Sequence, residues 1–181
     1  MKVLKDIVVT DLSRVLAGPF CAQQLADMGA NVIKVESPAG DENRNWQPLL
    51  ANGMSSNYAS VNRGKRAVTL NLKAAHGPRI LRRLIERSDV VLHNFLPDTA
   101  ARLGLSYEAV QAINPRLVYC SINGYGEKGA MRNKPGYDMM LQAFSGTMST
   151  TGFEGGPPVR SGVSFIDMAT GLAAYGAIVG A

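Results

Sequence analysis

Asp167 is the side chain in this sequence that is best placed to do chemistry. It is the one charged residue in the final stretch SGVSFIDMATGLAAYGAIVGA, residues 161–181. A carboxylate among small, apolar residues is poorly hydrated, which makes it a better nucleophile, while a helix N-terminus favours its ionised form. Carboxylates can form covalent acyl intermediates. The alternative interpretation is structural, because aspartate is also a favoured N-cap residue.

Other catalytic and cofactor signatures are incomplete or missing. His76 and His93 lie in separate segments, and no cysteine or carboxylate joins them at metal-ligand spacing. Gly18 lies in the first turn, but the other glycines of a dinucleotide-binding fingerprint are absent, so Glu36 is a weak candidate for a ribose ligand. The sequence contains no phosphate-binding P-loop and no serine-hydrolase elbow. We interpret His93, in an apolar segment, as a core residue.

Composition narrows the class of protein. The chain has 181 residues, 46% hydrophobic and 18% charged, with a net charge of +5, which suits a globular domain with an anionic ligand. Lysines and arginines are dispersed, which argues against nucleic acid as a partner.

The segments MKVLKDIVV and 168–181 resemble neither a signal peptide nor a membrane span, so we expect a cytoplasmic protein with no membrane contact. Cys21 and Cys120 are expected to be reduced packing residues.

The pattern of apolar residues predicts strands that alternate with helices. Strands are expected at residues 6–12, 31–37, 67–72, 89–95 and 116–122. Helices are expected at residues 19–29, 74–88, 107–115 and 137–146, with a short one opened by Pro97 and a last one that begins near Asp167. Residues 38–64 are expected to form a long irregular loop. Such alternation predicts an α/β fold, here an open, mostly parallel, Rossmann-like sheet with flanking helices.

The predicted sheet brings several polar segments to one place. In open α/β sheets, ligands bind beyond the carboxyl ends of the strands. The turns after four of the expected strands should therefore share one edge. That edge would carry Ser37, Lys73, Asn94, Phe95 and Gly124.

Six sequence blocks, taken together, resemble the class III coenzyme A transferases, the family of formyl-CoA transferase and carnitine CoA-transferase. They occur in the family's order and at its spacing from about residue 6 onward. The blocks are DLSRVLAGPFCAQQLADMGANVIKVESPAGD, NRGKRAVTLNLK, DVVLHNFLPDTAARLGL, NPRLVYCSINGYG, KPGYDMMLQAFSG and TTGFEGGPPVRSGVSFIDMATG.

The resemblance implies an enzyme that moves coenzyme A (CoA) from an acyl-CoA to a carboxylic acid acceptor. Asp167 matches the family's catalytic aspartate, which forms an aspartyl–acyl anhydride and then an aspartyl-CoA thioester. No metal or redox cofactor is implied, since the CoA thioester is itself a substrate. A water-poor site would protect the anhydride from hydrolysis.

The resemblance also assigns binding residues. The positions that match the family's CoA site are Arg14, Val15, Ala17, Leu70, Asn71, Leu72, Lys73, Asn94, Phe95, Arg102 and Lys134. Tyr137 and Asp138 match a pair that lies near the reacting centre. Where formyl-CoA transferase has a histidine and a glutamine in the first turn, this chain has Arg14 and Leu16. The acid pair is therefore open, and Arg14 is interpreted as a contact either to a different acid or to a CoA phosphate.

Members of this family are longer and form interlocked homodimers. On that basis residues 1–181 are expected to be the N-terminal part of the large domain, without the second domain and the C-terminal segment, and to have little or no transferase activity alone. Two alternatives stay open. One is the acyl-CoA racemase branch, which has a histidine at or next to the position of Tyr137 and Asp138. This chain has no histidine there. The other is a non-catalytic module that binds CoA or a nucleotide.

Overall fold

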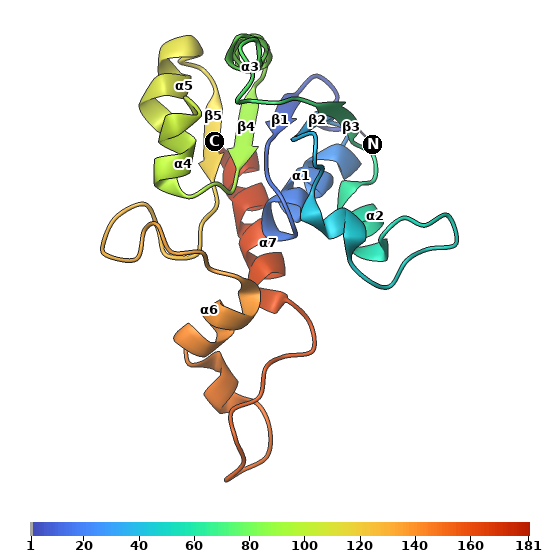
Figure 1. Cartoon of the computed structure of the whole chain (residues 1–181), viewed down its shortest axis with the longest axis vertical. Helices are drawn as coiled ribbons and strands as arrows, with labels where there is room; N and C mark the ends of the chain where they lie inside the picture. The colour runs from blue at the N-terminus through green and yellow to red at the C-terminus, as the bar shows by residue number, and fades with distance from the viewer. Residues whose placement is uncertain (1) are drawn as a thin grey trace.

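A computed structural model, which describes residues 2–181, contains one parallel sheet of five strands (Figure 1). The strands are β1 (Val8–Asp11), β2 (Asn31–Glu36), β3 (Arg66–Thr69), β4 (Val90–His93) and β5 (Val118–Ser121). Their order is β3-β2-β1-β4-β5, and every neighbouring pair is parallel. The predicted Rossmann-like sheet is confirmed. The order reverses between β1 and β4, and such a switch point is where open α/β sheets form a crevice.

The structure has seven α-helices among residues 2–181, and five of them cover the two faces of the sheet. The seven are α1 (Ala17–Asp27), α2 (Ser56–Asn62), α3 (Gly77–Glu86), α4 (Pro97–Arg102), α5 (Tyr107–Ile113), α6 (Asp138–Phe144) and α7 (Phe165–Gly180). Helices α1 and α7 pack on one face, while α3, α4 and α5 pack on the other. Helix α6 and the loop after it extend away from the sheet, at the bottom of Figure 1. Among residues 2–181, no helix is both long and apolar enough to cross a membrane.

Two hydrophobic cores result, one on each face. Strand β4 serves both, because Val90 and Leu92 contact the α1–α7 side while Val91 contacts the α3–α5 side. Such a strand reads as a continuous apolar run, which is why the sequence predicted it clearly. Cys21 and Cys120 lie in or against the α1–α7 core as free thiols, as expected. Burial raises their pKa values to about 12 and about 11.

The prediction of an irregular loop at residues 38–64 is wrong for two stretches. A short 3-10 helix forms at Glu42–Asn45, and α2 follows it. Each begins at a side-chain cap: the Asp41 carboxylate accepts from the Asn43 N–H at 3.1 Å, and the Ser55 hydroxyl accepts from the Tyr58 N–H at 3.3 Å. These caps satisfy backbone donors that would otherwise be free.

Helix α7 approaches α1 closely at Gly171. A Cβ atom there would lie 2.7 Å from the Ala17 carbonyl oxygen and 3.0 Å from the Phe20 ring. We therefore expect Gly171→Ala to lower the free energy of unfolding by about 1–3 kcal/mol, although alanine favours helix. Gly176→Ala is the matched control, because nothing lies within 4 Å of its Cβ position. The control should raise stability by up to about 1 kcal/mol. Urea unfolding measures both, and equal stabilities would contradict this packing.

Candidate functional site

Two adjoining cavities open at the carboxyl edge of the sheet. The smaller, of about 240 Å³, is walled in part by Tyr137 and Asp167. The larger, of about 900 Å³, lies beyond the ends of β2 and β3, and its volume is within the range of ligand sites. The two cavities share Arg14, Phe95 and Thr99. The five residues predicted from strand order to lie at this edge, Ser37, Lys73, Asn94, Phe95 and Gly124, all line one cavity or the other.

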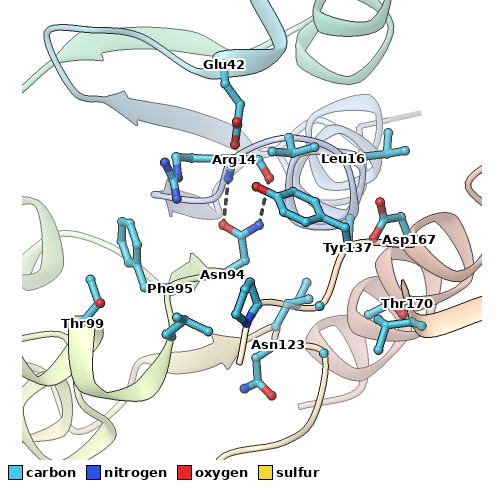
Figure 2. Close-up of a pocket in the computed structure, with 18 residues that line it drawn as sticks. Arg14, Leu16, Glu42, Asn94, Phe95, Thr99, Asn123, Tyr137, Asp167 and Thr170 are labelled. Carbon is cyan, nitrogen blue, oxygen red and sulfur yellow. Dashed lines mark hydrogen bonds between the residues drawn. The ribbon is translucent and has the colours of Figure 1, made fainter. Parts of the chain in front are cut away.

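Asp167 is the third residue of α7, and its side chain lies at the wall of the smaller cavity (Figure 2). The N-cap interpretation of this residue is wrong, because the cap position is Ser164. A different carboxylate satisfies the first turn of α7. The Oδ1 atom of Asp138 accepts the N–H groups of Ile166 at 2.9 Å and Asp167 at 3.2 Å. The Asp167 carboxylate is thereby left available to the cavity.

Asp138 belongs to a buried clamp, which we define as Asp138 and Gln142. The Gln142 Nε2 atom donates to Asp138 Oδ2 at 2.5 Å, and Gln142 Oε1 accepts from the Ser161 N–H at 2.8 Å. The clamp therefore ties α6 to the segment before α7 and to α7 itself. Asp138, which the resemblance placed near the reacting centre, lines neither cavity and lies behind the wall, because its carboxylate caps α7.

The environment of Asp167 changes its acidity. Burial, together with the negative charge of Asp138, raises the pKa of Asp167 to about 6. The poor hydration expected of this carboxylate is therefore the largest cause of the shift in its pKa. The carboxylate is still mostly ionised at pH 7. It is also more basic than an ordinary aspartate, which favours nucleophilic attack.

The turn after β1 is held against the turn after β4. The Arg14 N–H donates to Asn94 Oδ1 at 2.9 Å, and Asn94 Nδ2 donates to the Arg14 carbonyl oxygen at 2.8 Å, as the dashed lines in Figure 2 show. The Asn94 amide thus joins β1 and β4 across the switch point. Among residues 2–181, the Arg14 guanidinium makes no ion pair, and Arg14 lines both cavities.

Two titratable residues near the site have structural roles. His93 is almost fully buried, and burial lowers its pKa to about 4. Its Nδ1 atom accepts from the Phe95 N–H at 3.2 Å and its Nε2 atom lies 2.7 Å from the Tyr119 hydroxyl, so the neutral ring orients the Phe95 segment. The core interpretation of His93 is confirmed. Glu36 bonds Arg44 and Tyr58 through its carboxylate, so it is not free to bind a ribose.

Comparison with known proteins identifies the family. Residues 4–181 match the family model described as CoA-transferase family III. The chain belongs to this family.

Three relatives illustrate the match. The chain is 48% identical to succinyl-CoA:glutarate CoA-transferase of Mus musculus over 99% of this chain and 41% of the relative. It is 42% identical to formyl-CoA:oxalate CoA-transferase of Streptomyces avermitilis, over 99% of this chain and 44% of the relative. The crystal structure of a CAIB/BAIF family protein from Brucella suis matches with a TM-score of 0.93 and 42% identity, covering 98% of this chain and 48% of that one. The chain thus spans less than half the length of these relatives.

Most of the positions that the family resemblance assigned to CoA gather at this edge. Val15, Ala17 and Asn94 line the smaller cavity. Those that line the larger cavity are Leu70, Asn71, Leu72, Lys73 and Arg102. Arg14 and Phe95 line both. Lys134 is exposed and lines neither cavity. Lys73 and Arg102 make the larger cavity suitable for phosphate groups.

Sequence reasoning missed Glu42, Thr99, Asn123 and Thr170, which also line the smaller cavity. Thr170 follows Asp167 by three positions on α7, and residues at that spacing share a helix face. Helical spacing could therefore have found it. Glu42 carried no such signal, because it lies in the stretch that was expected to be irregular.

Proposed function

We propose that this chain provides the nucleophile and the CoA-binding edge of a transferase that moves CoA from an acyl-CoA to a dicarboxylic acid. One observation carries the proposal. The Asp167 carboxylate, whose pKa is raised, lines a cavity that adjoins a larger cavity lined by Lys73 and Arg102. The named relatives support a dicarboxylate acceptor, since glutarate and oxalate are both dicarboxylates. Arg14, which lines both cavities, is a suitable contact for the carboxylate that does not react.

The chemistry requires no net proton transfer. A carboxylate oxygen of Asp167 attacks the thioester carbonyl carbon, the C–S bond breaks, and CoA leaves as a thiolate, which gives the mixed anhydride. The thiolate then attacks the aspartyl carbonyl, which releases the first acid as a carboxylate and leaves an aspartyl-CoA thioester. The acceptor carboxylate attacks this thioester, the C–S bond breaks, and CoA thiolate leaves a second mixed anhydride. The thiolate then attacks the acceptor's carbonyl carbon in this anhydride, which forms the new acyl-CoA and frees the Asp167 carboxylate. Each step replaces one activated acyl group by another.

The Asp138–Gln142 clamp supports this assignment of Asp167. It orders the first turn of α7 through backbone hydrogen bonds, so the carboxylate is positioned without using its own oxygens. Positioning of a nucleophile lowers the barrier, because less freedom is lost in the reaction. We further propose that residues 1–181 are the N-terminal part of the family's large domain and that the complete protein is an interlocked homodimer. A cytoplasmic location stays a prediction.

Covalent labelling tests the proposed function. The complete protein that contains these residues is incubated with succinyl-CoA and ¹³C-labelled glutarate, and is then quenched and digested. We expect labelled glutaryl-CoA, together with a CoA adduct on the Asp167 peptide that hydroxylamine converts to a hydroxamate. CoA binding with neither adduct nor product would favour the non-catalytic module. Exchange of the C2 proton of a 2-methylacyl-CoA in D₂O would favour the racemase branch.

The pH dependence of adduct formation should follow the ionisation of Asp167. Because the nucleophile must be ionised, the rate should fall as pH falls through about 6. Asp138→Asn removes a negative charge that disfavours ionisation, so the midpoint should move to lower pH. Glu42→Gln is the control, because Glu42 also lines the cavity but is not a cause of the shift. Single-turnover rates across pH measure the midpoint, and an unchanged value in Asp138→Asn would contradict this electrostatic account.

A further inference from the structure

Val15, in the turn after β1, has an unusual backbone conformation. Its φ is 68°, and it is the one non-glycine residue with positive φ among residues 2–181. The left-handed region is unfavourable for a β-branched side chain, at a cost of about 1–2 kcal/mol. Such strain persists only where the surroundings impose it, and it is often found at functional sites. Val15 lines the smaller cavity, between Arg14 and Leu16.

The groups that impose this conformation come from the segment after β2. The Val15 N–H points to the Asp41 carboxylate, 3.2 Å from Oδ1 and 3.3 Å from Oδ2. The Val15 carbonyl oxygen accepts from Asn43 Nδ2 at 2.8 Å. Both polar groups of the strained residue are therefore held from one side, by the side chains of two residues that are each 1% exposed.

Asp41 is itself held by an ion pair inside the protein. The Lys34 Nζ atom lies 2.9 Å from Asp41 Oδ2, and the two side chains are 1% and 0% exposed. The same ammonium donates to the Ser13 carbonyl oxygen at 2.9 Å, so it also contacts the turn that contains Val15. A buried pair of this kind needs good geometry to offset the loss of hydration. These contacts join β2, the segment after it and the first turn.

We propose that Asp41 is a positioning residue of the CoA site: with Lys34 and Asn43, it holds Val15 in the left-handed conformation and so sets the course of the first turn. Arg14 and Val15 of that turn line the smaller cavity, and so does Ala17, the first residue of α1. The role in CoA binding rests on the proposed function. The control of the turn by Asp41 stands independently of the ligand.

A double-mutant cycle in the complete protein tests the proposal. Asp41→Asn alone leaves a buried ammonium unpaired, so the neutral variant Lys34→Met/Asp41→Asn is used, with Asn43→Ala as a second variant. Each is made with Val15 and with Val15→Gly, because glycine adopts positive φ without support. The readouts are CoA affinity by calorimetry and hydrogen exchange of the amides at residues 13–17.

With Val15 present, both variants should speed hydrogen exchange in the turn and weaken CoA binding about tenfold, because the competent turn is less populated. In the Val15→Gly background the same changes should weaken binding by less than about threefold. Equal losses in both backgrounds, or faster exchange with unchanged affinity, would overturn the positioning role. If the unaltered protein binds no CoA, the proposed function fails, and unchanged exchange in the variants would separately overturn the control of the turn.

Discussion

Asp167→Asn is expected to abolish the covalent adduct and to lower CoA exchange in the complete protein by at least about a thousandfold. The asparagine side chain has nearly the same shape as aspartate, but its amide oxygen does not attack a thioester. The backbone contacts to Asp138 involve the N–H group of residue 167, so they remain after the substitution. The loss should therefore fall on kcat, with the fold retained. Product formation and intact-mass measurements check both parts.

Two controls separate loss of the nucleophile from loss of the site. CoA affinity of the Asp167→Asn protein should stay within about threefold of the original, because the cations of the larger cavity are untouched. Glu42→Gln, which changes another carboxylate at the smaller cavity, should keep the adduct. Exchange between two acids that persists in Asp167→Asn would refute the covalent mechanism, and so would an adduct on a different residue.

Lys65→Met is expected to cause a large loss of stability. The Lys65 Nζ atom lies 2.9 Å from Asp11 Oδ2, with side chains 2% and 0% exposed. Although burial opposes it, the ammonium groups of Lys65 and Lys34 hold the pKa of Asp11 below its usual value. Removing Lys65 leaves the Asp11 carboxylate buried without its nearest cation, which should lower the free energy of unfolding by about 3–5 kcal/mol. Urea unfolding at neutral pH measures the loss.

An exposed ion pair gives the comparison for Lys65. The Arg63 Nη2 atom lies 2.7 Å from Asp27 Oδ2, but the two side chains are 64% and 36% exposed. Arg63→Met should therefore cost no more than about 1 kcal/mol. The neutral double variant Lys65→Met/Asp11→Asn should recover a large part of the loss, since no buried charge is then left without its partner. If Arg63→Met and Lys65→Met cost the same, burial does not control the strength of these pairs.

The elements that the sequence predicted well are those whose signal is local. Apolar runs such as residues 89–95 indicate buried parallel strands, and turn positions follow from strand order. The burial of Lys34 and Lys65 had no such signal, because lysine is ordinarily exposed and its partners are distant in the chain. The capping role of Asp138 was likewise hidden, since it depends on a contact with α7 that only the folded chain creates.

The placement of α7 has a consequence for protein synthesis. All five strands have been translated by Ser121, so the sheet can assemble while later codons are still being read. The wall that carries Asp167 belongs to α7, the last helix among residues 2–181, which packs on α1. A polypeptide still emerging from the ribosome therefore holds Lys73 and Arg102 of the larger cavity well before it holds Asp167. Under the proposed function, the site therefore lacks its nucleophile until α7 has left the exit tunnel.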